Sequence, residues 1–322
     1  MPHLDFVKRL LDSITKYNID SIHTYIVVPK KDLEMFEKLD YPHTSVIIEE
    51  ELPTAFAVEP VGGIRPGYIN QEISKLAFHR MNLVDNYLCL DSDGEFLREF
   101  RLSDFLTTSG QPYSVLVEDN EIQIDSDYYD RYWIGRKESQ TKILEFLNMD
   151  KNEVWLNCHN FQIFSTKMLR LFDVVVLQPH DFDYIDLMKI SAYEFAWYNF
   201  FIQSLNLPLR IREPYFKVFH TEHQLGLARL SKLDHKKISQ GYLGVCIQSN
   251  FLGNNGSISL EENIFVTHSR FMSYGELTRV ILAKIWNDVR KPRILIYRIL
   301  TAVGFGKILK LYPLLKRRLK KN

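Results

Sequence analysis

The chain has 322 residues, of which 46% are hydrophobic and 25% charged. This is the composition of an ordinary globular protein, and it excludes disordered, collagen-like and disulfide-rich chains. The 40 basic and 40 acidic residues cancel, but unevenly: residues 289–322 hold eleven Lys and Arg residues and no acid, which leaves a net charge of −11 on residues 1–288. We therefore expect a large acidic domain over 1–288 followed by a basic tail over 289–322.

Cysteine use and hydropathy predict a cytoplasmic protein. The three cysteines, Cys89, Cys158 and Cys246, are far apart and form no C-x-x-C pair, which favours a reducing compartment. The first residues show no signal peptide, and no window approaches the roughly 18 to 20 apolar residues of a spanning helix.

The first half of the chain alternates between helical and extended patterns. Apolar residues at helical spacing from Leu4 to Ile14 predict a helix that stops at Asn18. β-branched and aromatic runs then predict strands that alternate with helical stretches. In chain order, we expect a strand over 22–28, a helix over 32–39, a strand over 45–48, a helix over 71–81 and a strand over 87–90.

The second half continues the same alternation. Strand, helix, strand is the order that produces parallel sheets, so the predicted fold class is α/β, with a mostly parallel central sheet flanked by helices. We expect helices over 139–147, 164–172 and 193–205, and strands over 174–177, 215–219 and 244–247.

A D-x-D motif, Asp91-Ser92-Asp93, follows the apolar strand predicted over 87–90. Ligands of parallel sheets bind beyond the carboxyl ends of the strands. Two carboxylates one residue apart at such an end are suited to a hard divalent cation that bridges to a diphosphate. A second copy, at 125–127, follows an alternating and half-exposed pattern, so the sequence favours the first copy.

Two other residues have both a structural and a functional interpretation. Glu194 follows Ser191 at the start of a predicted helix, where an acid favourably caps the helix dipole, but it is also a candidate base that accepts a hydroxyl proton. His220 ends a predicted strand, and it is either an ordinary structural histidine or a third ligand to a metal held by Asp91 and Asp93.

The tail interleaves its eleven cations with leucine, isoleucine and valine. Such a segment is typical of an element that lies on an anionic membrane surface, whereas a nucleic-acid arm and a solvated terminal helix are the alternatives. The interleaved leucines favour the membrane. Because the acidic remainder of the chain repels nucleic acid, we expect no nucleic-acid partner.

Five segments together resemble one family, the GT-A-type glycosyltransferases of bacterial surface-polysaccharide clusters. Their order matches a strand ending in Pro, a Gln-x-x-x-Lys-Leu helix, a D-x-D strand end and a Ser-x-Tyr-Glu helix start. The resemblance covers roughly residues 4–250, and its segments are 25–32, 46–51, 67–76, 90–93 and 191–194.

The resemblance implies a GT-A-like fold and a transfer of sugar from a nucleotide-sugar donor, a UDP-sugar first of all, to a glycan or lipid-linked acceptor. It implies that Asp91 and Asp93 hold Mn²⁺ or Mg²⁺ and that Glu194 is the acceptor-side base if the reaction inverts. The residues it implies for the donor and sugar pocket are Gln71, Lys75, His159 and Tyr193.

Two departures from the family pattern motivate alternatives. Relatives begin with a strand whose loop contacts the nucleotide base, whereas this sequence opens at the following helix, and Ala192 stands where relatives often have an acid. The alternatives are a non-catalytic glycan-binding or scaffold protein on the same frame, and a metal-dependent nucleotidyltransferase, which also uses paired acids.

Overall fold

The computed structural model describes residues 3–116, 129, 135–150 and 161–248. They all belong to one of two units into which the chain divides, Met1–Glu262. Several sequence predictions lie outside the described residues: the second D-x-D motif, His159, and the tail with its boundary at 288/289.

The protein has an α/β architecture with three small sheets among the described residues. The pairs β1–β2 and β6–β7 are parallel, whereas β3–β5 and β4–β7 are antiparallel. The prediction of parallel strand pairs is thus confirmed in part, but the single, mostly parallel sheet is not formed by these residues. The strands are β1 Thr24–Val28, β2 Thr44–Ile48, β3 Asn86–Leu90, β4 Gly94–Phe96, β5 Phe161–Ser165, β6 Phe216–Phe219 and β7 Gly244–Ile247.

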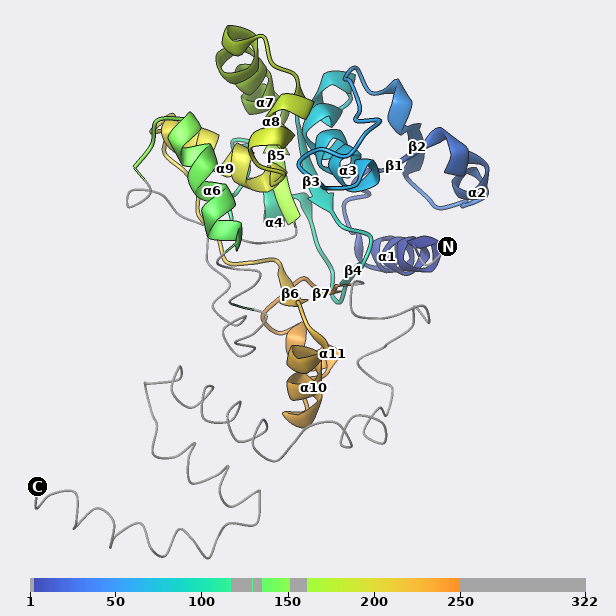
Figure 1. The fold of residues 1–322 in the computed structure, drawn as a ribbon. Coiled ribbons are helices and arrows are strands. Elements are labelled where there is room, and N and C mark those ends of the chain that lie inside the picture. The colour runs from blue at the N-terminus through green and yellow to red at the C-terminus, as the bar shows by residue number, and fades with distance from the viewer. Residues whose placement is uncertain (1–2, 117–128, 130–134, 151–160, 249–322) are drawn as a thin grey trace, which may run out of the picture. The chain divides into compact units, whose positions relative to one another are not determined.

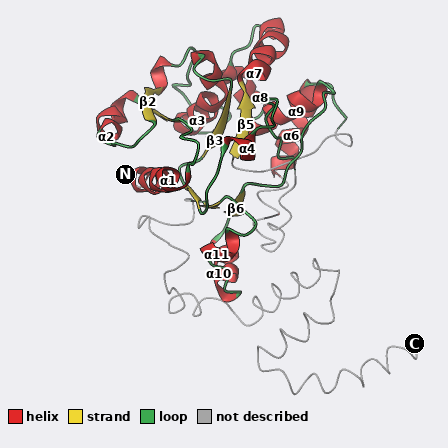
Figure 2. Cartoon of the chain, turned by 180° about the vertical axis from the view of Figure 1, so that it is seen from behind, coloured by secondary structure: helices red, strands yellow, loops and turns green. Residues whose placement is uncertain are grey.

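Helices cover both sides of the central β3–β5 pair. Both views show α3 on the side of β1 and β2, and α6 and α9 on the other side (Figure 1, Figure 2). The α-helices are α1 His3–Tyr17, α2 Leu33–Glu37, α3 Pro66–Ala77, α4 Leu102–Phe105, α6 Gly135–Phe146, α7 Thr166–Phe172, α8 Tyr184–Ile190, α9 Glu194–Ser204, α10 Glu222–Leu230 and α11 His235–Ile238. Shorter helical turns are η1 Lys30–Asp32, η2 Glu49–Glu51, η3 Phe78–Met81, η6 Asp173–Leu177 and η7 Gln178–His180.

The largest hydrophobic core joins α3, α6, α7, α8 and α9. Its centre is aromatic, with Trp197 and Tyr184 both 0% exposed. The inward face of α3 contributes Ile69, Ile73 and Leu76, also 0% exposed, so this helix is held rigidly against the core. Rigid packing of α3 and α9 fixes the polar side chains that the two helices present to each other.

One predicted element is wrong, the strand over 174–177, and the helix predicted over 164–172 is confirmed as α7 but begins two residues later, at Thr166. Residues 174–177 form a π-helical turn, η6, that continues α7, although their β-branched sequence favours a strand. Val174 and Val175 are 53% and 49% exposed, so only half of the run packs inward. Phe164, predicted to begin a helix, instead belongs to the fully buried strand β5. Short apolar runs do not distinguish a buried strand from a buried helix.

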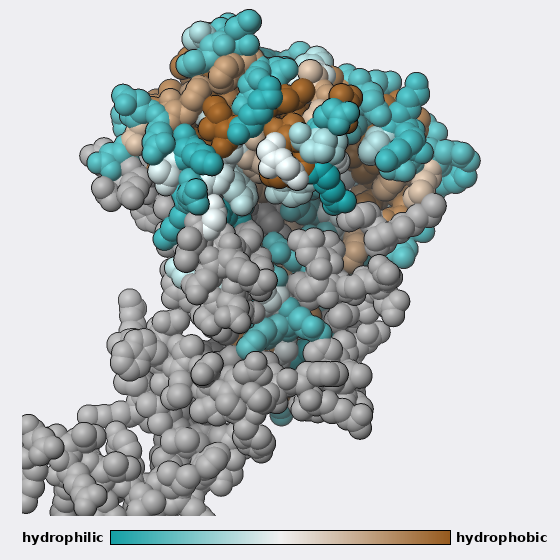
Figure 3. Space-filling view, in the orientation of Figure 1, coloured by the Kyte–Doolittle hydropathy of each residue, from teal (hydrophilic) through white to brown (hydrophobic). Residues whose placement is uncertain are grey.

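The surface alternates between hydrophilic and apolar areas. On the face seen in Figure 3, apolar patches are exposed between hydrophilic side chains. Within the described residues, no helix is long and apolar enough to cross a membrane.

Candidate functional site

Four side chains from three distant segments meet at the carboxyl end of β3. The Lys75 Nζ on α3 lies 3.0 Å from the Asp91 Oδ1, directly after β3, and 2.9 Å from the Glu194 Oε1, at the start of α9. The Gln71 Nε2 donates to the same Asp91 Oδ1 over 3.3 Å. The structure thus brings together Gln71, Lys75, Asp91 and Glu194, each of which the sequence predicts as a site residue.

A third acid, Glu72, completes this group, which we call the lysine–carboxylate cluster (Gln71, Glu72, Lys75, Asp91 and Glu194). The Glu72 Oε2 lies 3.5 Å from the Lys75 Nζ. The Glu72 and Glu194 carboxyl groups therefore lie against the same ammonium, and each affects the pKa of the other. One ammonium group therefore faces three carboxyl groups.

The cluster has an open side and a buried side. The Asp91 side chain is 27% exposed and Gln71 is exposed at the surface. The side chains of Lys75, Glu194 and Glu72 are only 10%, 6% and 4% exposed. A ligand that approaches from solvent meets Asp91 and Gln71 first, with Lys75 behind them.

The cluster contains more acids than cations, and the pKa values of its members are shifted. Burial opposes the charged form of Lys75, but Asp91, Glu194 and Glu72 raise its pKa well above the ordinary value. Burial and the charge of Glu194 raise the pKa of Glu72 well above its usual range. Burial also raises the pKa of Asp91, and Lys75 offsets only part of that rise. Strongly perturbed groups of this kind concentrate at functional sites.

Glu194 behaves differently from the other two acids. Burial favours its neutral form, yet the charge of Lys75 and the hydrogen bonds from Glu72 and Lys75 lower its pKa overall. Glu194 is therefore ionised at neutral pH, as a proton acceptor must be.

The local sequence explains why these groups converge. Gln71 and Lys75 stand four residues apart, and Glu72 and Lys75 three apart, so all three project from one side of α3. At the start of α9, the indole Nε1 of Trp197 donates to the Ser191 carbonyl oxygen over 2.9 Å and anchors the chain entering the helix. The Lys75 Nζ lies 4.8 Å from the centre of the Phe195 ring, a cation–π contact that covers the ammonium from the core side.

Asp93 hydrogen-bonds to strand β7. Its Oδ1 accepts a hydrogen bond from the Cys246 Sγ over 3.1 Å, and its carbonyl oxygen accepts from the Ile247 backbone over 3.3 Å. Both partners belong to β7. His220 follows β6, on the other side of β7 in the same sheet. The structure therefore separates Asp93 and His220 by a strand instead of gathering them with Asp91.

The described residues include no group of three or more His, Cys, Asp or Glu side chains arranged to hold a metal ion. Asp91 and Asp93 nevertheless present partly exposed carboxylates two residues apart after β3. Mg²⁺ is commonly held by one or two carboxylates together with substrate phosphates, without a full protein cage. The pair fits an ion that arrives with a diphosphate, whereas a dedicated three-ligand site with His220 is not formed.

Tyr193, the remaining predicted pocket residue in the described part of the chain, is half-buried next to Glu194. The Arg136 guanidinium lies 4.6 Å from the centre of its ring. Tyr193 therefore stacks with Arg136 of α6 at the start of α9.

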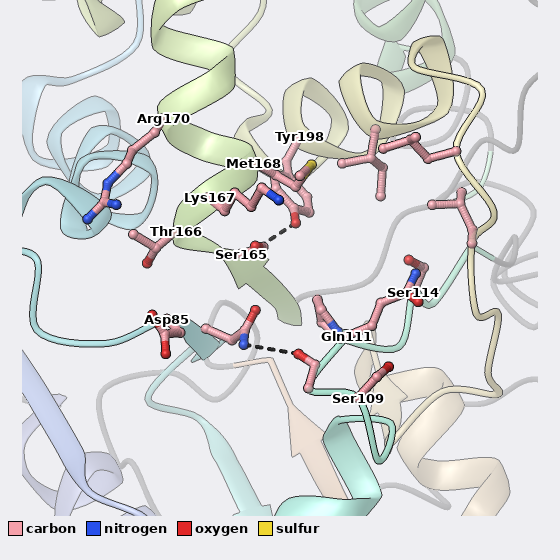
Figure 4. Close-up of a pocket in the computed structure, with 16 residues that line it drawn as sticks. Asp85, Ser109, Gln111, Ser114, Ser165, Thr166, Lys167, Met168, Arg170 and Tyr198 are labelled. Atoms are coloured by element: carbon pink, nitrogen blue, oxygen red, sulfur yellow. Dashed lines mark hydrogen bonds between the residues drawn. The ribbon is translucent and has the colours of Figure 1, made fainter.

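A separate pocket of about 460 Å³ lies at the other end of β3 (Figure 4). None of the predicted site residues lines it. Its polar groups are largely used within the protein: the Ser165 backbone donates to the Tyr198 hydroxyl, the Asn86 amide donates to the Gly110 carbonyl oxygen, and Arg170 donates to Asn82. We regard the lysine–carboxylate cluster as the candidate site because its charged groups are closer together and more strongly perturbed.

The sequence pattern does not predict Glu72 as a site residue. The available signal was its position three residues before Lys75, which places acid and base on the same face of a helix. That spacing is common on solvated helices, and only the tertiary structure shows that Glu72 is buried.

In comparisons with known proteins, no family model matches this chain and no curated protein matches it at a significant level.

Proposed function

We propose that the protein is a glycosyltransferase with a GT-A-like frame. It transfers a sugar from a nucleotide-sugar donor, a UDP-sugar first of all, to a surface-polysaccharide or lipid-linked acceptor. The observation that supports this most is the convergence of Gln71, Lys75, Asp91 and Glu194, predicted separately for the donor and acceptor sides. The order of strand β3, D-x-D motif and strand β4 is consistent with it.

On the donor side, Asp91 and Asp93 would hold Mn²⁺ or Mg²⁺ together with the diphosphate of the donor. When bound, the ion neutralises the charge that develops on the leaving nucleoside diphosphate. Lys75 lies directly behind Asp91 and adds a fixed positive charge, and the Gln71 amide holds the Asp91 carboxylate from the solvent side.

On the acceptor side, Glu194 takes the proton of the attacking hydroxyl if the reaction inverts. The acceptor oxygen forms a bond to the anomeric carbon as the bond from that carbon to the phosphate oxygen breaks. The leaving nucleoside diphosphate keeps the electron pair, and the proton moves to a carboxylate oxygen of Glu194. Lys75 keeps Glu194 ionised before this step.

In this proposal, the protein works in the cytoplasm at the inner face of the membrane. The support is compositional: residues 289–322 carry eleven basic and no acidic residues, interleaved with aliphatic ones, which suits an anionic lipid surface.

The test measures nucleoside diphosphate release from a panel of nucleotide sugars with Mn²⁺. We expect release from at least one donor, and a loss of about 100-fold in Asp91→Asn, the equivalent of about 2.7 kcal/mol of transition-state stabilisation. Asp12→Asn, which alters an exposed acid that accepts from Tyr41, is the matched control and should retain the full rate.

Other outcomes would contradict the proposal. Full, metal-dependent release by both Asp91→Asn and Asp93→Asn would remove the D-x-D assignment. Release of pyrophosphate from nucleoside triphosphates would favour a nucleotidyltransferase, and donor binding without turnover would favour a binding or scaffold protein.

A further inference from the structure

Glu72 is a buried acid that the proposed function does not use. Its side chain is only 4% exposed, the lowest value in the lysine–carboxylate cluster. Its contact with Lys75 is also the longest of the three, 3.5 Å against 3.0 Å for Asp91 and 2.9 Å for Glu194. Among the acids that share this ammonium, Glu72 receives the least compensation from it.

The charges of the cluster do not balance if every acid is ionised. Three carboxylates around one ammonium would leave two uncompensated negative charges in a mostly buried site, which is strongly unfavourable. Two neighbouring carboxyl groups in such a site relieve the repulsion by retaining a proton, and the proton stays on the group that is most buried and least compensated. Glu72 and Glu194 are almost equally buried, so their distances to the Lys75 Nζ decide, and the longer one belongs to Glu72.

We propose that Glu72 is a positioning residue that retains its proton and donates it in a hydrogen bond to the Glu194 carboxylate, thereby holding Glu194 against Lys75. The catalytic meaning of this contact rests on the proposed function. The contact itself does not, and it is tested without measuring activity.

The electrostatic environment agrees with this arrangement. The pKa of Glu72 is raised well above its usual range and that of Glu194 is lowered, and a hydrogen bond between the two acids contributes to both shifts. The other charged or titratable groups that act on Glu72 are Lys75 and Tyr68 on its own helix and Asp91 after β3.

For catalysis, the arrangement gives Glu194 two supports on different sides. Lys75 comes from the last turn of α3 and Glu72 from about one turn earlier on the same helix. Held by both, the carboxylate has a fixed direction and stays ionised while the acceptor binds.

The experiment follows the titration of Glu194 in the full chain by carboxyl ¹³C NMR, with the signal identified by its loss in Glu194→Gln. Glu72→Gln keeps a hydrogen-bond donor, so the Glu194 midpoint should stay at its wild-type value. Glu72→Met removes the donor, so the midpoint should rise by about one pH unit. A midpoint that falls in both variants would show that Glu72 is ionised, and an unchanged midpoint in both would show that there is no contact. Either result overturns the proposal.

A second measurement keeps the proposal testable if Glu72→Met does not fold. An acid that is protonated in the folded protein releases its proton on unfolding at any pH above its unfolded pKa, which is about 4.3. The unfolding constant of the wild type should therefore rise relative to that of Glu72→Gln, about tenfold per pH unit above that pKa. Glu34→Gln, a change at an 88% exposed acid, should show no such trend. A flat ratio for Glu72→Gln would overturn the proposal. Neither measurement depends on turnover, so failure here and failure of the proposed function are distinguishable.

Discussion

Two groups of charged side chains lie about one turn apart on the continuous helical segment formed by α3 and η3. In the lysine–carboxylate cluster, Lys75 faces three acids. In the second group, which we call the Asp173 cluster (His79, Arg80, Asp173 and Tyr184), one acid is surrounded by donors. The Arg80 Nε lies 2.9 Å and the His79 Nε2 3.2 Å from the Asp173 Oδ2, and the Tyr184 hydroxyl donates to the Oδ1 over 2.7 Å.

The pKa of Asp173 is shifted in the opposite direction from those of Glu72 and Asp91. Burial alone would raise the pKa of Asp173, but hydrogen bonds from His79, Arg80 and Tyr184 lower it overall. In the lysine–carboxylate cluster, burial first of all and then the charges of neighbouring acids raise the pKa values of Glu72 and Asp91, and Lys75 offsets this rise only in part. Only Glu194, the third acid of the cluster, has a lowered pKa. An ionised acid that has enough donors and cations around it, like Asp173, stabilises the fold. A partly exposed acid with too few cations around it, like Asp91, is suited to a ligand that supplies positive charge.

The largest expected effect comes from removing the cation. Lys75→Met leaves the three acids without their cation in a mostly buried site, and we expect a loss of about 3 to 5 kcal/mol in the free energy of unfolding at pH 7. Lys38→Met, at a 71% exposed lysine, is the matched control. The measurement is urea unfolding of both variants and of the wild type.

The pH dependence of that loss identifies its cause. Without Lys75, the folded pKa values of all three acids are higher than in the wild type, so the variant loses more stability as pH rises above their unfolded values of about 4. The wild type shares the loss that the raised pKa values of Glu72 and Asp91 cause, but Glu194, whose pKa is lowered, does not add to it. The difference between the two proteins should therefore shrink toward pH 4. A loss that is the same at pH 4 and pH 7 would indicate a packing defect instead.

Much of the fold was predictable because the periodic signals are local. The pattern from Leu4 to Ile14 predicts α1, and the β-branched runs predict β1 and β2 to within a few residues. The failures occur where tertiary packing overrides local preference, as in residues 174–177, which extend a helix. The antiparallel pairing of β3 with β5 was not predictable either, because strand partners are set by contacts that are distant in sequence.

The candidate site residues were predictable from the sequence, but their arrangement in space was not. Asp91 and Glu194 are 103 positions apart in the sequence, and each has an ordinary structural interpretation there. Their meeting at Lys75 depends on how α9 packs against α3. Glu72 escaped prediction because its importance comes from burial, which one helix alone does not reveal.

A smaller effect is expected from removing the acid of the Asp173 cluster. Asp173→Asn leaves Arg80 without its carboxylate, which we expect to cost about 2 to 3 kcal/mol in unfolding free energy near neutral pH. Because the folded pKa of Asp173 is lowered, its contribution is present above the unfolded value of about 3.9 and is lost as pH falls through the folded value. The gap between the variant and the wild type should therefore close in strong acid.

The same variant separates stability from activity. Asp173→Asn should keep the nucleoside diphosphate release of the wild type, whereas Asp91→Asn should lose release without a comparable loss of stability. If Asp173→Asn abolished release in protein that is still folded, the Asp173 cluster would belong to the functional site and the contrast between the two clusters would fail.

The smallest expected effect tests a single hydrogen bond in the Asp173 cluster. Tyr184→Phe removes the hydroxyl that donates to the Asp173 Oδ1, and the chain offers a matched control in Tyr41→Phe, whose hydroxyl donates to the Asp12 Oδ1 over 2.9 Å at an exposed position. Because Tyr184 is 0% exposed and its acceptor is ionised, we expect a loss of about 1.5 kcal/mol there, against a few tenths for the control.

Loss of the Tyr184 donor should also raise the folded pKa of Asp173, because a hydrogen bond to the ionised form lowers the pKa. The stability that depends on this carboxylate would then disappear at a higher pH during acid unfolding than in the wild type, while Tyr41→Phe follows the wild-type curve. Equal losses in the two variants would mean that burial adds nothing to this bond. The Asp173 carboxylate would then be stabilised by Arg80 and His79 alone.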